Sequence, residues 1–600
     1  VLSGKCAAAM IRGIQSCGVG TSAKHFAANN QESCRIQNNA VVPQRALREI
    51  YLKSFEIAVK EGNPWSVMSS YNRVNGTYSM ESRFLLTDVL RKDWGYRGIV
   101  VSDWFGKRDT PAQIHAGNDL LMPGEQAQVD EIIAAVRSGA LAVEDLDICA
   151  GRVLEYVLKT PHFRKYAYSD APSLEQNARV SASAASDGIV LLKNEDGALP
   201  LAEGANVSLL GVNAYDGIVA GIGAGFVNSS YKVNLDEGLR NAGFILNPKT
   251  DAVYRRYMDY SEALLGEENS RKHLGDRTFP AEAFLSDAFL GMRAADSDIA
   301  VISFGRLSGE YNDRYTRDFY LHEDELDLLR RTCAAFHSRG RKVVVVLNVC
   351  GVVETASWKD LPDAILVNWL PGQELGNATA AVLSAQVNPS GRLPMTFPLD
   401  YRDHLSSENY PFDYTSKRSD WEYDAPERKI RNLGWTEYLE GVDVGYRYFC
   451  TKAPEKISFP FGFGLSYTSF EWSDAALTRK GNDFRVTLRV TNTGDRPGRD
   501  VVQLYASAPE SELYKPVREL KAFAKTPVLS PGSSATLELT FSAYDLASFD
   551  ESLSAFVSQE GTYTLQLNRD ASTIVTTLPL ILKKTLRWPV TRAAPSSSLR

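Results

Sequence analysis

The stretch Gly98-Ile-Val-Val-Ser-Asp-Trp104 places a carboxylate and an indole directly after a short run of apolar residues. Such a run, bounded by turn signals, is typical of a strand buried in a parallel sheet. Barrel enzymes keep their catalytic residues at the carboxyl ends of such strands, so Asp103 is a candidate catalytic carboxylate. The flat face of Trp104 suits a sugar ring. The competing interpretation is that Asp103 only caps the following helix.

A second polar group follows another short apolar strand. Lys24-His25-Phe26 ends the predicted strand Gly20–Phe26 and is followed by Ala-Ala-Asn-Asn-Gln-Glu32. Consecutive side chains of a strand point to opposite faces, so Lys24 and His25 can share a site only if the chain bends there. These amide and charged groups suggest hydrogen bonding to a polyhydroxylated ligand. The alternative is a loop whose Asn and Gln side chains bond their own backbone.

The third candidate is the charged loop after the predicted strand Ile299–Phe304. It contains Glu310 and Asp313, with Arg306 and Arg314 nearby. Open α/β sheets present their ligands to loops that leave the carboxyl ends of parallel strands, which favours a functional loop. A charged loop is also the ordinary form of a solvated surface, so both interpretations stay open at this point.

The elements that position Lys24 and Asp103 lie in residues 1–163, which alternate short apolar runs with amphipathic helices. This indicates four βα units, whereas a closed eightfold barrel needs about 250 residues. Half a barrel would leave open parallel edges, so we expect the first part of the barrel to lie outside this chain or to come from another chain. The predicted strands are Gly20–Phe26, Ser66–Tyr71, Gly98–Asp103 and Asp119–Met122, and the predicted helices are Pro43–Glu61, Ser82–Lys92 and Val129–Ser138.

Residues 164–186 are predicted as a linker, because they are polar, rich in Ser and Ala, and contain Pro172. Residues 187–400 form a second α/β block, an α/β sandwich whose apolar runs suit parallel strands buried on both faces. Its turn Gly221-Ile-Gly-Ala-Gly225 resembles a dinucleotide fingerprint only weakly, because the spacing is not G-x-G-x-x-G; no cofactor is expected. The predicted strands are Ile189–Leu192, Val207–Val212, Ile299–Phe304, Val343–Val349 and Ile365–Trp369, and the predicted helices include Glu323–Arg339 and Gly376–Ala385.

A third region follows an aromatic, loop-like connection over residues 401–467. Apolar and polar residues alternate through residues 468–585, which predicts a small antiparallel sandwich. Residues 586–600 contain Ala-Ala-Pro-Ser-Ser-Ser and are predicted as a tail with little to bury. The alternating runs are Phe484–Val490, Val501–Tyr505, Thr536–Phe541 and Thr562–Leu567.

The composition excludes several classes of protein. A net charge of −7 and scattered Lys and Arg residues argue against nucleic acid or an anionic membrane as a partner. The longest apolar run, Val343–Val353, is too short to span a bilayer. The seven cysteines form no CxxC or Cys/His cluster, so no metal site is expected. Free thiols favour a reducing, cytoplasmic compartment over a secreted protein.

Taken together, the three candidate stretches resemble glycoside hydrolase family 3, the β-glucosidase-type enzymes. The resemblance covers nearly the whole chain in the family's usual order, including a terminal fibronectin type III-like sandwich, and several motifs are long enough to be specific. The motifs are Lys24-His25-Phe26-Ala-Ala-Asn-Asn-Gln-Glu32, Met68-Ser-Ser-Tyr71-Asn-Arg-Val-Asn-Gly76, Val101-Ser-Asp103-Trp104, Ala116-Gly-Asn-Asp-Leu-Leu-Met-Pro-Gly124, Ser308-Gly-Glu310, Leu370-Pro-Gly-Gln-Glu-Leu-Gly376, Asn388-Pro-Ser-Gly-Arg-Leu-Pro394, Phe459-Pro-Phe-Gly-Phe-Gly-Leu-Ser-Tyr467 and Pro516-Val-Arg-Glu-Leu520.

This resemblance implies a retaining mechanism. Asp103 would attack the anomeric carbon, and Glu310 would protonate the leaving oxygen and later activate water. We expect donors to hold Asp103 ionised and a less polar setting to keep the proton on Glu310. Retention needs the two carboxyl groups about 5–5.5 Å apart, so the two regions must meet over the pocket. By the same resemblance, Lys24, His25, Arg35 and Tyr71 would bind sugar hydroxyls or steady Asp103, and Trp104 would line the −1 site.

Two departures from the family pattern concern sugar binding. Earlier strands of the family's barrel supply an Asp and an Arg that hold the sugar, and neither can be assigned in this chain. Ala224 stands where related enzymes often place a Ser that faces the sugar.

The loop after Lys24-His25 favours the β-glucosidase branch of the family over two others. The N-acetylglucosaminidase branch carries Pro-Gly-His-Gly there, and the β-xylosidase branch carries a different loop. We therefore expect an exo-acting β-glucosidase that removes terminal non-reducing β-D-glucosyl residues, with a β-xylosidase or dual-specificity enzyme as the alternative. A catalytically incomplete carbohydrate-binding fragment and a nucleotide-binding protein are the other classes left open. The expected ligand is a β-glucoside or oligosaccharide; a second copy of the chain or a separate N-terminal barrel segment are the candidate protein partners.

Overall fold

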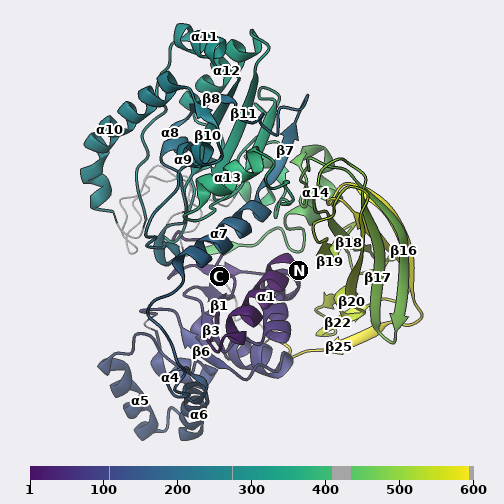
Figure 1. Cartoon of the computed structure of the whole chain (residues 1–600). Helices are drawn as coiled ribbons and strands as arrows, with labels where there is room; N and C mark the ends of the chain where they lie inside the picture. The colour runs from purple at the N-terminus through teal and green to yellow at the C-terminus, as the bar shows by residue number, and fades with distance from the viewer. Residues whose placement is uncertain (107, 273–274, 312, 409–433, 594–600) are drawn as a thin grey trace.

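The computed structural model describes residues 1–106, 108–272, 275–311, 313–408 and 434–593. Two α/β regions lie one above the other in Figure 1, and a β-sandwich of the later residues, coloured green to yellow, stands beside both. Within the described ranges no helix is long and apolar enough to cross a membrane. Of the expected connection over residues 401–467, the part from 409 to 433 lies outside the described residues.

The first region is built on three parallel strands in the order β1-β3-β6, namely Ser22–Phe26, Ser66–Ser69 and Ile99–Ser102. The predicted fourth strand, Asp119–Met122, is wrong: only one bridge forms, between Leu120 and Val101. The Asp119 carboxylate accepts a hydrogen bond from the Val100 N–H. Pro123 has no N–H to donate to a neighbouring strand. The helical segments are α1 (Leu2–Ser16), α2 (Gln44–Ala46), η1 (Leu47–Tyr51), α3 (Lys53–Ile57), η2 (Ala58–Gly62), η4 (Phe84–Asp93), α4 (Thr110–Ala116), α5 (Gln126–Ser138) and α6 (Val143–Lys159).

A small second sheet joins this region to a distant part of the chain. Strand β14 (Trp435–Glu437) pairs in parallel with β2 (Asn39–Val41), and the sheet continues through β4 (Arg73–Val74) and β5 (Thr77–Tyr78). The chain therefore returns to the first region after it has completed the second.

The predicted linker 164–186 is only partly correct, because helix α7 (Leu174–Gly188) occupies its second half. Its Ala residues are strong helix formers. The Ser186 hydroxyl donates to the Ala378 carbonyl of α13 (Leu375–Leu383). Composition alone suggested a loop, whereas packing of small side chains against α13 favours a helix.

The second region contains a six-stranded sheet with the order β7-β12-β11-β10-β8-β9. Strand β7 runs antiparallel to β12, so the expectation of parallel strands throughout fails at this edge. An apolar run reports burial and not direction, and an antiparallel edge strand on a parallel sheet is common. The strands are β7 (Val190–Asn194), β8 (Asn206–Leu210), β9 (Ile245–Leu246), β10 (Ile299–Arg306), β11 (Lys342–Val349) and β12 (Ala364–Val367); the helices besides α13 are α8 (Val212–Tyr215), α9 (Leu235–Asn241), α10 (Pro248–Ser270), α11 (Asp287–Asp296) and α12 (Glu323–His337).

Strands β8 and β10 are neighbours at the point where the direction of strand addition in this sheet reverses. The chain goes from β8 outward to β9, and from β10 in the opposite direction to β11. Loops that diverge in this way leave space at the carboxyl ends of their strands. A cavity of about 660 Å³ lies there, lined by Val212 and Ile222 after β8 and by Gly305 and Leu307 at the end of β10.

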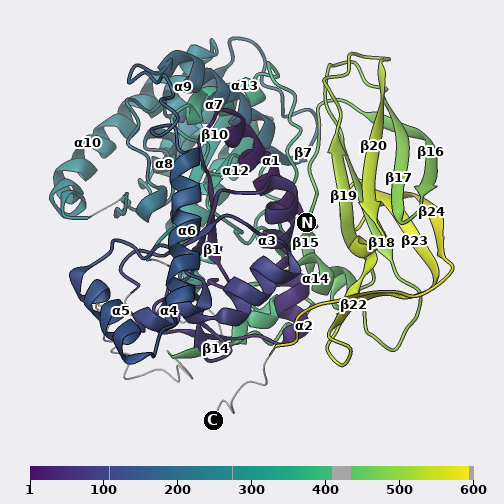
Figure 2. The same cartoon turned by 90° about the horizontal axis from the view of Figure 1, so that it is seen from below.

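The third region is a β-sandwich, seen beside the other two regions in Figure 2. One sheet has the order β16-β17-β20 and the other β19-β18-β23-β24. The predicted tail is wrong at its start, because β25 (Leu586–Pro589) pairs with β22 and its Leu586 and Trp588 pack on the sandwich core. The strands are β16 (Phe470–Lys480), β17 (Asp483–Asn492), β18 (Val501–Ser507), β19 (Glu519–Lys525), β20 (Ser534–Ser542), β21 (Ser548–Asp550), β22 (Ala555–Ser558), β23 (Gly561–Asn568) and β24 (Ile574–Leu582).

The core of the second region predicts the effect of a truncation in α12. Phe336 is fully buried against the sheet, so Phe336→Ala removes apolar contacts and leaves a cavity. We expect thermal and denaturant unfolding of this region to show a loss of about 3–5 kcal/mol. Leu264→Ala, at an exposed position of α10, is the control; an equal loss in both variants would contradict this prediction.

Candidate active site

Asp103 lies directly after β6, as its place in the sequence predicts. Its backbone N–H donates to the Ser69 carbonyl of the neighbouring strand at 3.2 Å, and the residue is 7% exposed. Oδ1 of Asp103 accepts the Trp104 N–H at 2.8 Å. Oδ2 lies 3.6 Å from Nε2 of His25. One carboxylate oxygen is thus held by the backbone while the other faces the histidine.

The strand is irregular at Lys24 and His25, as a site shared by both side chains requires. The register of β1 against β3 shifts between Ala23 and Phe26, and Lys24 is exposed while His25 is half-buried. Burial is the largest effect on the pKa of His25 and lowers it; Asp103 opposes this effect, and Lys24 and Arg35 add to it. The imidazole is therefore neutral near pH 7, with one nitrogen able to donate and the other to accept.

Tyr71 and Trp104 frame the same carboxylate. The Tyr71 hydroxyl donates to the Trp104 carbonyl at 2.6 Å. Burial, and then the charge of Asp103, raise the pKa of Tyr71 far above its usual value, so its hydroxyl keeps its proton. The Trp104 side chain is 47% exposed, with the Phe105 ring 6.1 Å away. It offers a flat apolar face beside Asp103.

Glu310 comes from the second region and is held by the glycine turn. The Glu310 N–H donates to the Ile222 carbonyl at 3.0 Å, and the Ala224 N–H donates to Glu310 Oε2 at 2.7 Å. Gly223 has a φ of +86°, and a Cβ there would lie 2.1 Å from the Cβ of Glu310. Only glycine fits this position. The turn between Gly221 and Gly225 thus positions a carboxylate, which the weak nucleotide-binding fingerprint did not suggest.

Arg35 joins the two regions. Its Nη1 lies 2.9 Å from Glu310 Oε1 and 3.2 Å from Glu32 Oε2. Its guanidinium stacks over the rings of Tyr71 and Tyr311, at 4.9 and 4.3 Å from their centroids. The run Asp103, Tyr71, Arg35, Glu310 therefore connects both candidate catalytic carboxylates. All seven predicted site residues lie in this one cluster: Lys24, His25, Arg35, Tyr71, Asp103, Trp104 and Glu310.

The setting of Glu310 differs from the expected one. Burial alone would raise its pKa, but the Ala224 N–H and the Arg35 guanidinium outweigh burial and lower it below its usual value. Without a ligand, Glu310 is therefore a carboxylate near pH 7. The expectation of a less polar setting that retains the proton is wrong for this state, because the cation that supplies the contact comes from the other region.

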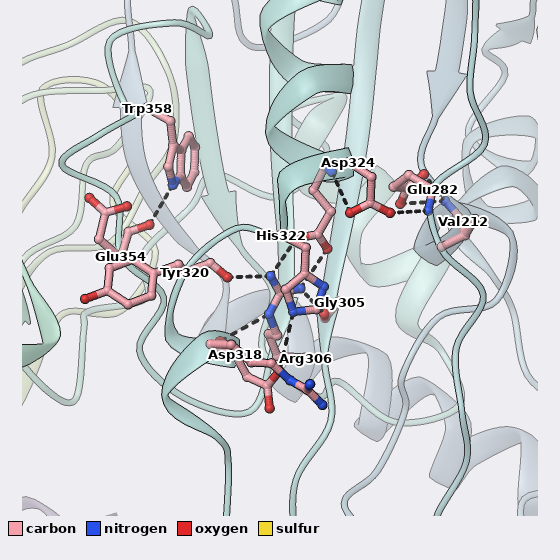
Figure 3. Close-up of polar contacts among 12 residues, drawn as sticks. Val212, Glu282, Gly305, Arg306, Asp318, Tyr320, His322, Asp324, Glu354 and Trp358 are labelled. Carbon is pink, nitrogen blue, oxygen red and sulfur yellow. Dashed lines mark hydrogen bonds and ion pairs between the residues drawn. The ribbon is translucent and has the colours of Figure 1, made fainter. Parts of the chain in front are cut away.

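The loop that carries Glu310 is anchored at its base, as Figure 3 shows. Arg306 is buried and donates to both oxygens of Glu325, at 2.7 and 2.6 Å. It also donates to the carbonyls of Asp318 and Tyr320 at 3.1 and 2.7 Å. Arg306, the last residue of β10, therefore connects this strand with α12 and with the loop segment at Asp318 and Tyr320.

Near Arg306, Glu282 accepts the Val212 N–H with both oxygens at 3.2 Å and donates its own backbone N–H to Asp324 (Figure 3). Burial, together with the charge of Glu325, raises the pKa of Glu282 to about 8. These contacts fix the end of β8 next to the base of the Glu310 loop.

The sequence did not predict that several further residues of the site contribute contacts there. Glu32, Tyr311 and Asp313 make contacts between the two regions, and Ala224 contributes only its backbone N–H. Glu32 and Asp313 stood out solely as charged members of polar loops. Their partners are more than 270 positions away in the chain, so no local pattern identifies them.

The described residues contain no group of three or more His, Cys, Asp or Glu that could hold a metal ion. All seven cysteines lie in the described ranges, and no two of them form a disulfide.

Comparison with family models divides the chain in the same order as the structure. Residues 2–156 match the glycosyl hydrolase family 3 N terminal domain, residues 189–467 the glycosyl hydrolase family 3 C-terminal domain, and residues 500–571 a fibronectin type III-like domain. These matches confirm the predicted fold class: a partial (β/α)8-type barrel, an α/β sandwich and a fibronectin type III-like β-sandwich.

Similar proteins are named as glycosidases. Beta-glucosidase B of Emericella nidulans is 32% identical, over 96% of this chain and 83% of that protein. The exo-alpha-(1->6)-L-arabinopyranosidase of Bifidobacterium breve is 33% identical, over 97% of this chain and 72% of that protein. The structure of beta-glucosidase 3B from Thermotoga neapolitana in complex with glucose superposes with a TM-score of 0.91 at 39% identity, covering 98% of this chain and 81% of that one.

The ion pair between Arg35 and Glu310 predicts a pH-dependent contribution to stability. Because the folded pKa of Glu310 lies below its usual 4.5, its contribution is complete above about pH 4.5 and is lost as the pH falls through the folded pKa. We expect Glu310→Gln to lower the unfolding temperature at pH 7, and this difference to shrink below about pH 4.5. Glu175→Gln, which removes the exposed pair with Arg179, should change little at either pH. A Glu310→Gln deficit that is constant with pH would contradict the prediction.

Proposed function

Since this chain belongs to glycoside hydrolase family 3 and is a glycoside hydrolase, we propose that it is a retaining, exo-acting β-glucosidase. It would release terminal non-reducing β-D-glucosyl residues by double displacement. The observation that carries the proposal is the pairing of Asp103, at the end of a barrel strand, with Glu310, brought from the second region and linked to it through Tyr71 and Arg35.

In the first step, an oxygen of Asp103 attacks the anomeric carbon while the bond to the leaving oxygen breaks. Oδ2 suits this role because Oδ1 is occupied by the Trp104 N–H. The leaving oxygen takes its proton from Glu310, so the products are a glycosyl-enzyme ester, a free alcohol and a Glu310 carboxylate. In the second step that carboxylate takes a proton from water, the water oxygen attacks the same carbon, and Asp103 is released.

Glu310 needs a proton for the first step, although Arg35 favours its carboxylate in the free protein. A sugar in the site would change this balance. Its hydroxyls would accept hydrogen bonds from Arg35, and its ring would exclude water; both effects raise the pKa of Glu310. The carboxylate form seen without ligand suits the second step, in which Glu310 acts as a base.

The sugar-binding role is proposed for Lys24, His25, Arg35 and Tyr71, with the Trp104 face as the platform of the −1 site. Half-buried His25 offers a donor beside Asp103, and exposed Lys24 offers one near His25 and Glu310. Apolar sugar faces stack on aromatic rings. Relatives named as β-glucosidases, including one whose structure holds glucose, favour a glucoside as the substrate.

A second candidate is a pentopyranosidase, since two relatives that are 33% identical are named exo-alpha-(1->6)-L-arabinopyranosidase. The sequence analysis gives a β-xylosidase or a dual-specificity enzyme as the alternative to a β-glucosidase. A panel of nitrophenyl β-D-glucoside, β-D-xyloside and α-L-arabinopyranoside separates these possibilities. The substrate with the highest kcat/KM identifies the specificity, and binding of a glycoside without turnover would favour an incomplete carbohydrate-binding fragment.

Covalent labelling tests the nucleophile. An activated 2-deoxy-2-fluoro-β-glucoside should leave one sugar on the protein, and peptide sequencing should find it on Asp103, because the fluorine slows both steps and the activated leaving group speeds only the first. Asp103→Asn should fold normally and neither react nor turn over substrate. A label on another residue, or turnover in Asp103→Asn, would contradict the assignment.

The acid role of Glu310 is tested with leaving groups of different basicity. Glu310→Gln should reduce kcat/KM about 10²–10⁴-fold for alkyl glucosides, which need the proton. Dinitrophenyl glucoside should be cleaved nearly as fast as by the unaltered protein in the glycosylation step, because its leaving group departs as an anion. An equal reduction for both substrates would argue against the acid role.

A further inference from the structure

We propose that Glu32 and Asp313 form a reciprocal latch that docks the Glu310 loop onto the first region and so sets the position of Glu310 relative to Asp103. They are positioning residues and not catalytic ones. This inference rests on the proposed function, because it assigns them a part in delivering the acid/base group.

Each carboxylate of the latch accepts backbone N–H groups from the opposite region. Asp313, in the second region, accepts the Glu32 N–H at 3.1 and 3.2 Å and the Ser33 N–H at 2.7 Å. Glu32, in the first region, accepts the Tyr311 N–H at 2.9 Å. Glu310 is adjacent to Tyr311, so these bonds fix the backbone on which Glu310 is carried.

The conformation of the loop depends on this docking. Tyr311 has a φ of +73°, in the left-handed region that aromatic residues rarely adopt. Its N–H is held by Glu32 and its ring lies 4.3 Å from the guanidinium of Arg35. Contacts from the first region therefore support a backbone conformation that the loop would not favour alone.

Glu32 also controls how Arg35 is shared. One nitrogen of Arg35, Nη1, contacts Glu32 at 3.2 Å and Glu310 at 2.9 Å. The side chain of Arg35 is 9% exposed and that of Glu32 23% exposed, so solvent screens these charges only partly. Without the Glu32 charge, the full attraction of Arg35 would fall on Glu310 and favour its carboxylate more strongly.

The charged groups that face Glu32 and Glu310 come from both regions. Lys24 and Arg35 belong to the first region and lower the pKa of Glu310. Asp313 belongs to the second and raises the pKa of Glu32 together with burial and Glu310, while the Tyr311 N–H and Arg35 oppose them. Loss of the Glu32 charge would thus lower the pKa of Glu310. Loss of Asp313 would mainly move the Glu310 side chain away from its position.

The test compares Asp313→Ala, Asp313→Asn and Glu32→Gln with Asp550→Asn as the matched control. Asp550, in the sandwich, also accepts two successive backbone N–H groups, from Ser552 and Leu553. We expect Asp313→Ala to lower kcat/KM for alkyl glucosides by about 10²-fold, the size of effect that misplacement of a catalytic group produces. The dinitrophenyl glucoside should be affected far less. Asp313→Asn should be intermediate, because its amide oxygen still accepts a hydrogen bond, and Asp550→Asn should match the unaltered protein.

For Glu32→Gln, the fall of kcat/KM with rising pH should begin at a lower pH than in the unaltered protein, which a purely structural role would not produce. Equal losses for both leaving groups in Asp313→Ala, or an unshifted pH profile in Glu32→Gln, would overturn the latch.

Hydrogen exchange separates failure of the latch from failure of the proposed function. The amides of Glu32, Ser33 and Tyr311 should be protected in the unaltered protein, and Asp313→Ala should expose the first two. If the unaltered protein neither turns over a glycoside nor takes the 2-fluoro label on Asp103, the proposed function fails. The exchange result still shows whether Asp313 binds the Glu32 and Ser33 amides. Unchanged protection in Asp313→Ala would overturn the latch even in an active enzyme.

Discussion

The ion pair between Arg35 and Glu310 is the constraint on which the site depends. A guanidinium with a side chain only 9% exposed needs opposite charge nearby, since an uncompensated buried charge is strongly destabilising. Arg35 finds that charge in Glu32 of its own region and Glu310 of the other. The same contact therefore compensates a buried cation, joins two α/β regions and lowers the pKa of a carboxylate that the proposed reaction uses.

The architecture explains how a residue from the second region reaches this cation. Strands β8 and β10 are neighbours whose loops diverge, and the two loops meet again where Glu310 binds the backbone of the glycine turn. Gly223 allows an approach that any side chain would block. At the other end of the loop, Arg306 fixes the base through Glu325 and through the carbonyls of Asp318 and Tyr320; Figure 3 labels Arg306, Asp318 and Tyr320. Glu310 is thus held from both sides before it contacts the first region.

Local patterns in the sequence predict much of this structure. Asp103 follows an apolar run, so its place after a buried strand could be read directly, and the alternation of the sandwich strands identifies β17, β18, β20 and β23. The preceding strand marked the loop of Glu310 as a candidate, but only the family motifs singled out Glu310 and Arg35 as site residues. The direction of β7, the strand at Leu586–Pro589 and the contacts of Glu32 with Tyr311 depend on partners far along the chain. For the same reason, residue types near Glu310 could not indicate that an arginine from the other region lowers its pKa.

The pairing of β14 with β2 has a consequence for how the protein is made. Residues 39–41 emerge from the ribosome early, yet their strand partner at residues 435–437 is synthesised only after the entire second region. Contacts between such distant parts of a chain form slowly, and domains generally fold in the order of their synthesis. One edge of β2 in the first region therefore stays without its strand partner until the second region has been synthesised.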